Sequence, residues 1–176
     1  KDRNRFFLSG NILTVPGQHM TVTKHNGGIP QQMFASTGLT ESVLAVENRD
    51  GKSDFMLVCE HASNHFPDCF GTLGLADAAR SAHIAWDPGT EHVGRYLARV
   101  LNAPLQLANY SRLVVELNRG EDHGDCMRDS SDHVKIPGTK GLTAAQQQAR
   151  LDDIYWPYHN EITRQLDAVL ARGQVP

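Results

Sequence analysis

The stretch FMLVCEHASNHFP, residues 55–67, decides the fold class of this chain. An apolar run, Phe55–Cys59, leads directly into polar residues and then into a proline. A continuous apolar run bounded by turn signals is typical of a strand buried on both faces, within a sheet that helices cover. We therefore predict a strand over Phe55–Cys59 that delivers Glu60, His61 and Asn64 to one end of a sheet.

Helix and strand patterns alternate after this first strand. Helices are predicted over residues 75–86 and 91–102, and strands over residues 103–108 and 112–118. Thr143 and Gln146 form a capping box at the start of a long C-terminal helix, which Pro157 should kink or divide. This order of elements predicts an α/β fold.

The predicted helix over residues 91–102 is amphipathic, with Thr90 as its N-cap. Its apolar residues recur at helical spacing and share one face. They are Val93, Leu97, Val100 and Leu101.

Composition narrows the class of protein. The formal net charge is −3 and no stripe of Lys and Arg is present, which argues against nucleic-acid binding. No apolar run approaches the ~20 residues that a membrane span needs. Three cysteines without CxxC spacing argue against a disulfide framework, so we expect a reducing cytoplasm.

Residues 1–45 show no sustained periodicity. We expect an N-terminal extension or arm there, with a short β-arm around the sequence NILTV (residues 11–15) as the alternative. Residues 46–176 then form a single α/β domain.

The polar residues after the predicted strands are the candidate functional site. Ligand sites in open α/β sheets lie beyond the carboxyl ends of the strands. If the strands over 55–59 and 112–118 are parallel, His61 therefore meets Asn118 and Arg119 at one edge.

Each candidate residue has a structural alternative. His61 is either a metal ligand or an ordinary loop histidine. Asp87, which stands before a Pro-Gly turn, is a ligand, a general base or a turn residue, and Glu60 competes with it as the base. Arg112 either binds a substrate carboxylate with its planar two-donor group or makes a surface ion pair.

Four blocks of the sequence resemble the N-formylglutamate amidohydrolase family. They are VENRDGKSDFMLVCEHASNHFP, LGL with RSAHIAWDPG, NAPLQLANYSRLVVELNR and IPGTKGLTAAQQQARLDDIYWPYHNEI, in the order and approximate spacing of the family, over roughly residues 46–170. The resemblance implies the fold of a zinc carboxypeptidase relative, with a central mixed sheet flanked by helices. It also implies hydrolysis of a small acidic N-acyl amino acid, such as N-formyl-L-glutamate, to formate and the amino acid.

The resemblance implies roles for the candidate residues. His61, Asp87 and Asn64 correspond to the metal-binding positions, and the expected metal is zinc. Asn64 stands where related carboxypeptidases have a glutamate ligand. Glu60 or Asp87 would move the proton, and the remaining three candidates would bind the substrate carboxylate. They are Arg112, Asn118 and Arg119.

The same resemblance predicts that the domain is incomplete at its C-terminus. The family continues with a further strand that ends in an HSFTP-like block, and ARGQVP stands where that strand would begin. An open sheet edge and an uncovered apolar helix face favour association, so we expect a homodimer. A catalytically inactive family member that binds a small acid or a partner is the alternative to an enzyme.

Overall fold

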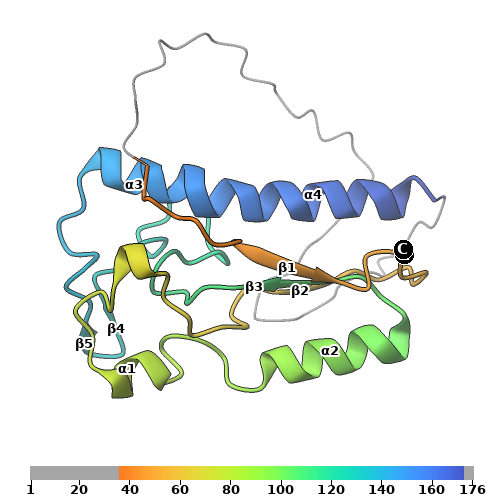
Figure 1. Cartoon of the computed structure of the whole chain (residues 1–176), viewed down its shortest axis with the longest axis horizontal. Helices are drawn as coiled ribbons and strands as arrows, with labels where there is room; N and C mark the ends of the chain where they lie inside the picture. The colour runs from red at the N-terminus through yellow and green to blue at the C-terminus, as the bar shows by residue number, and fades with distance from the viewer. Residues whose placement is uncertain (1–35, 173–176) are drawn as a thin grey trace, which may run out of the picture.

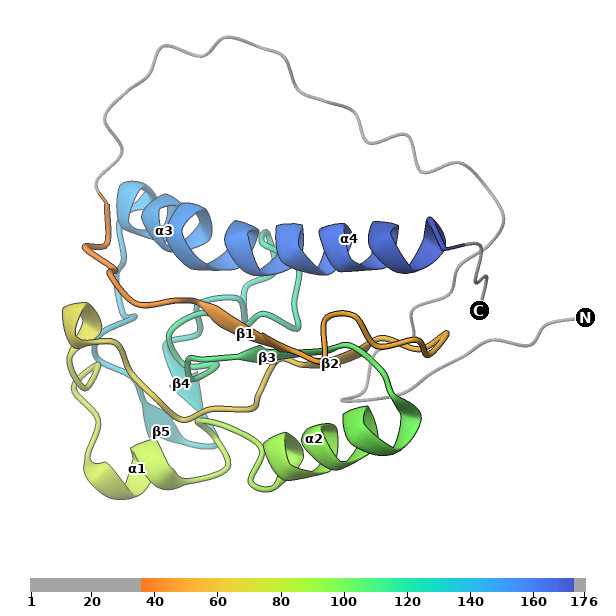
Figure 2. The ribbon, with the colours of Figure 1, turned by 45° about the vertical axis from the view of Figure 1, so that its right-hand side comes forward.

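The computed structural model describes residues 36–172, which form three layers (Figures 1 and 2). A small sheet lies between a long C-terminal helical segment on one face and two shorter helices on the other. The elements in chain order are β1 (Leu44–Glu47), β2 (Leu57–Cys59), a 3-10 turn (Asp68–Phe70), α1 (Asp77–Ser81), α2 (Thr90–Leu101), β3 (Leu105–Ala108), β4 (Ser130–Ser131), β5 (Val134–Lys135), α3 (Ala144–Arg150), a π-helical turn (Leu151–Tyr155) and α4 (Trp156–Leu170).

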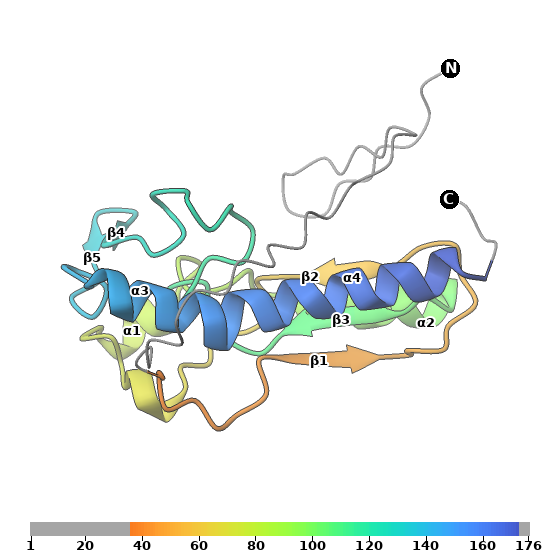
Figure 3. The ribbon, with the colours of Figure 1, turned by 90° about the horizontal axis from the view of Figure 1, so that it is seen from above.

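The sheet is mixed, with β3 in the middle of the order β1-β3-β2. β1 runs antiparallel to β3, with Leu44 opposite Ala108. β2 runs parallel to β3, with Leu57 opposite Leu105. Figure 3 looks onto the sheet and shows β1 and β2 at its two edges. The α/β class and the mixed sheet between helices are confirmed.

The predicted strand over residues 112–118 is wrong. These residues form turns, in which Val114 N donates to Ser111 O over 3.0 Å and Glu116 N donates to Cys126 O over 2.8 Å. Their apolar side chains are nevertheless buried in the main core. The apolar run therefore signalled burial rather than a strand, and its backbone is satisfied by turns and by the long loop that follows. The other two predicted strands are present in shorter form, as β2 and β3.

The helix predictions were correct in type and needed correction at their ends. The helix predicted over residues 75–86 is limited to α1. The helix α2 begins at Thr90 itself, and Gly89 occupies the N-cap position with a left-handed φ of 92°, which glycine adopts without strain. The capping box of Thr143 and Gln146 is confirmed. The C-terminal helix is not divided at Pro157: helical backbone continues from α3 through the π-helical turn into α4, and Pro157 lies in the first turn of α4.

Residues near the predicted start of the domain take part in the fold. Leu39, Val43 and Leu44 pack against the core, and β1 includes Leu44 and Ala45. The alternative of a β-arm at residues 11–15 concerns a segment outside the described residues. All three cysteines are free, as expected. None of the helices between residues 36 and 172 has the length and apolarity that crossing a bilayer requires.

Candidate functional site

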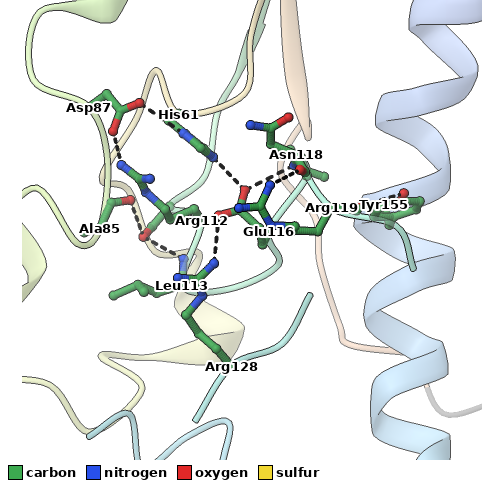
Figure 4. A network of polar contacts seen from close by, with 12 residues as sticks. His61, Ala85, Asp87, Arg112, Leu113, Glu116, Asn118, Arg119, Arg128 and Tyr155 are labelled. Atoms are coloured by element: carbon green, nitrogen blue, oxygen red, sulfur yellow. Dashed lines mark hydrogen bonds and ion pairs between the residues drawn. The ribbon is translucent and has the colours of Figure 1, made fainter. Parts of the chain in front are cut away.

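His61 lies directly after β2, at the carboxyl end of the parallel pair of strands, and is only 5% exposed. Its ring lies between two carboxylates (Figure 4). Nδ1 is 3.1 Å from Asp87 Oδ2, and Nε2 is 2.6 Å from Glu116 Oε1. Both ring nitrogens are thus held, which fixes the orientation of the imidazole.

The backbone positions both carboxylates. Asp87 N donates to the carbonyl of His61 over 3.0 Å, which ties the turn before α2 to the end of β2. Glu116 is 3% exposed, and its Oε1 also accepts from Asn118 N over 3.1 Å. Arg128, from the long loop, reaches Glu116 Oε2 over 3.3 Å. A buried carboxylate needs partners of this kind because its charge has lost water.

The shared hydrogen bond shifts the pKa values of its two members in opposite directions. Burial by itself lowers the pKa of His61, but the hydrogen bond and charge of Glu116, with a smaller contribution from Asp87, outweigh it and leave the pKa raised. Burial by itself raises the pKa of Glu116, but the hydrogen bond and charge of His61 leave it lowered. The pair therefore favours a protonated, charged imidazole beside an ionised carboxylate.

An arginine backs each of the two carboxylates. Arg112 forms an ion pair with Asp87 Oδ1, and its guanidinium donates to His83 O over 3.0 Å. The Nε atoms of Arg112 and Arg128 are both buried without a hydrogen-bond partner among the described residues. The result is a line of alternating charge, with His61 at its centre and an arginine at each end (Figure 4).

A cavity of about 290 Å³ opens beside His61. It brings together Glu60, His61 and Asp87, three of the residues predicted from the sequence. Val93 and Leu97 of α2 form its apolar wall. A pocket with an apolar wall and a few convergent polar groups is the usual form of a small-molecule site.

The other predicted residues occupy different places. Asn64 is turned away from His61, because its side-chain amide donates to Arg80 O over 3.2 Å and it lines a separate cavity. Asn118 and Arg119 lie beside Glu116 (Figure 4). Tyr155 from the π-helical turn donates to Arg119 O over 2.9 Å and so anchors that segment. The predicted meeting of the two polar clusters at one edge is therefore present, although the second cluster follows turns rather than a strand.

Glu116 is the central residue that the sequence reasoning missed. It stands inside the apolar run LVVEL, where a buried acid is unusual and needs a charged or hydrogen-bonding partner. A search for a charged or hydrogen-bonding partner of Glu116 would have pointed to His61, which was predicted to stand at the end of a neighbouring strand.

The donor set is incomplete for a zinc centre. The carboxylates of Asp87 and Glu116 contact opposite nitrogens of His61, so all three cannot converge on one ion. Within residues 36–172, no group of three or more His, Cys, Asp or Glu side chains is arranged to hold a metal. His61 and Asp87 together offer two ligand atoms on one side of the ring, one fewer than a catalytic zinc site uses.

The stability of the metal-free protein should depend on pH in a window set by His61 and Glu116. The pKa of folded His61 lies above its ordinary value of 6.5, so its stabilisation is complete below that pH and is lost as the pH rises through the folded value. The pKa of folded Glu116 lies below 4.5, so its stabilisation is present above that pH and is lost as the pH falls through the folded value.

We therefore expect the free energy of unfolding to be higher for the wild type than for the Glu116→Gln variant. This difference should be largest between about pH 4.5 and 6.5. Urea unfolding in the presence of a chelator, repeated from pH 4 to pH 9, measures this difference. A difference that stays constant across the range would contradict the coupling of the two groups.

Comparisons with known proteins agree with the fold and with the sequence blocks. The chain is similar to gene product Atu2144 from Agrobacterium tumefaciens, whose crystal structure aligns with 38% identity and a TM-score of 0.73. The alignment covers 74% of this chain and 52% of that one, so the chain spans about half the length of this relative. No curated protein matches significantly. The sequence model of the N-formylglutamate amidohydrolase family matches residues 53–176, and the chain belongs to that family.

Proposed function

We propose that the chain belongs to a hydrolase that cleaves the C–N amide bond of an N-acyl amino acid, such as N-formyl-L-glutamate, and releases formate and glutamate. The observation that carries this proposal is the buried His61, held between Asp87 and Glu116 in the wall of a cavity at the sheet edge. Family membership supports an amidohydrolase. We also propose that the sheet has the arrangement of the zinc carboxypeptidases and that the protein is located in the cytoplasm.

In this proposal, His61 and Asp87 would be two of the zinc ligands. Glu116 would then be the outer carboxylate that accepts from the opposite ring nitrogen, as metal-binding histidines usually require. A third ligand would come from outside the described residues. When bound, zinc would polarise the scissile carbonyl and lower the pKa of a bound water.

The remaining site residues have roles that fit their positions. Glu60 shares the cavity with His61 and is the candidate for proton transfer to the departing amine, and Asp87 is the alternative. Arg112, beside Asp87, is the candidate for recognition of the substrate carboxylate. Asn118 and Arg119 would contribute from the segment anchored by Tyr155.

The proposal is tested by measuring formate release from N-formyl-L-glutamate, together with the zinc content of the purified protein. Turnover that a chelator abolishes and added zinc restores is the expected result. A folded protein that binds no zinc and releases no formate would contradict it. That outcome would favour the second candidate, a non-catalytic module that binds small acids, which the incomplete donor set also supports.

Arg112→Ala should raise KM for N-formyl-L-glutamate about 10- to 100-fold, because a charged hydrogen bond contributes roughly 1.5–3 kcal/mol. Steady-state kinetics with this substrate and with a neutral analogue that lacks both carboxylates measure the effect. Arg99→Ala, which removes an arginine that stacks on Tyr96, is the control. Equal effects on both substrates would show that Arg112 does not recognise the carboxylate.

A further inference from the structure

Two side chains of the C-terminal helical segment bind the backbone just after Glu116. Tyr155 Oη donates to Arg119 O over 2.9 Å (Figure 4). One turn further along the helix, His159 Nε2 lies 3.1 Å from Leu117 O. Burial lowers the pKa of His159 and favours the neutral ring, whose single N–H sits on Nε2 because a carbonyl oxygen only accepts. The backbone after Glu116 is therefore held at two carbonyls by neighbouring turns of one helix.

The π-helical turn explains how the helix reaches this loop at more than one place. Arg150, at the end of α3, donates to Val114 O over 3.0 Å and so holds the start of the same loop. On a regular α-helix, Arg150 and Tyr155 would lie about 140° apart, because each residue turns the helix by about 100°. In the π-helical turn, Trp156 N donates to Leu151 O, five residues back. This wider winding brings residues five apart towards the same face, and such turns are frequent at functional sites.

The backbone held in this way completes the surroundings of His61. Glu116 Oε1 accepts from His61 Nε2 over 2.6 Å and from Asn118 N over 3.1 Å. Asn118 stands between the two residues whose carbonyls the helix binds. A shift of the Asn118 backbone therefore moves the carboxylate that orients the imidazole.

We propose that Tyr155 and His159 are positioning residues for His61, which act by fixing the orientation of Glu116. They hold the backbone that follows Glu116, so the carboxylate stays on Nε2 of the imidazole and leaves Nδ1 on the side of Asp87. A displacement of about 1 Å at a reacting group can cost a factor of about 10² in rate. The effect on turnover rests on the proposed function, whereas the effect on the hydrogen bond of His61 does not.

The Nε2 proton of His61 reports this positioning directly. It lies in a short, buried hydrogen bond and should exchange slowly with water. NMR of the protein with isotope-labelled histidine measures its exchange rate, and the backbone amides of β3 report global opening. Tyr155→Phe and His159→Phe should each accelerate exchange of the His61 proton about 10-fold more than exchange of the β3 amides, the effect of one lost hydrogen bond. In both variants, kcat/KM for formate release should fall about 10-fold.

Two further variants separate the lost hydrogen bond from altered packing. His159→Gln keeps a side-chain N–H donor, so it should return exchange and turnover to nearly the wild-type values. Tyr158→Phe is the matched control for Tyr155→Phe. Tyr158 is fully buried on the same helix, but its hydroxyl has no hydrogen-bond partner among the described residues. Tyr158→Phe should leave both measurements unchanged.

The outcomes distinguish positioning from a general contribution to stability. Equal acceleration of the His61 proton and the β3 amides in Tyr155→Phe and His159→Phe would overturn the proposal. So would a wild type in which the His61 proton exchanges freely. A wild type whose protected proton responds to both variants, but which releases no formate, would support the positioning role and contradict the proposed hydrolase.

Discussion

His61→Ala should reduce kcat/KM for formate release by about 10²- to 10⁴-fold, the range that a positioned proton-transfer or ligand group contributes. The reason is that His61 links the two carboxylates of the site, the partly exposed Asp87 through Nδ1 and the buried Glu116 through Nε2. Its loss removes a proposed zinc ligand and leaves both acids without their shared partner. Zinc stoichiometry should fall in parallel, and this is measured on the same preparation.

The chain provides a matched control for His61. His65, four residues further along, also pairs with a glutamate, but on the surface, where Nε2 is 2.7 Å from Glu41 Oε2. His65→Ala should leave formate release and zinc content unchanged. Circular dichroism of both variants separates loss of the site from loss of the fold. Unchanged zinc content in folded His61→Ala would show that His61 is not a ligand, and unchanged kcat/KM would remove it from catalysis.

The sequence was informative about the fold wherever local signals and burial agreed. The apolar run before His61 and the capping box of Thr143 and Gln146 both correspond to real elements. The run over residues 112–118 misled because apolar periodicity reports burial, and a run of turns inside a core is buried as thoroughly as a strand. Only the tertiary contacts of its backbone, to Ala85 and Cys126, distinguish the two.

The candidate site was predictable in part, for a related reason. His61 and Asp87 were selected because they stand next to turn signals at the ends of elements, and the structure brings the two side chains into contact. Glu116 was concealed in an apolar run, and its partner lies 55 residues earlier in the chain. Asn64 was selected by its spacing from His61, yet a hydrogen bond to Arg80 O, 16 residues further along the chain, directs its amide elsewhere. Spacing in the sequence does not determine the direction of a side chain in a loop.

Glu116→Ala should lower the free energy of unfolding by about 3–5 kcal/mol, the effect of removing one partner from a buried ion pair. Glu116 is nearly inaccessible and is the acceptor for His61, Arg128 and Asn118 N. Without it, the buried His61 ring loses the acceptor of its Nε2, and the partly exposed Arg128 loses its carboxylate partner. A loss of this size is a large share of the 5–15 kcal/mol that holds a typical domain folded. Urea denaturation at pH 6 measures it.

A second His–Glu pair separates burial from pairing as the cause of this loss. Glu41 and His65 form the same contact at nearly the same distance, 2.7 Å against 2.6 Å, but their side chains are 42% and 48% exposed, against 4% and 6% for Glu116 and His61. Glu41→Ala should therefore change the free energy of unfolding by no more than about 1 kcal/mol. Glu116→Gln keeps the shape of the side chain and one acceptor oxygen. Its loss in free energy of unfolding should therefore lie between the losses of the two alanine variants. Equal losses in the two alanine variants would mean that burial does not strengthen the dependence on Glu116, and the central place of this residue in the site would have to be abandoned.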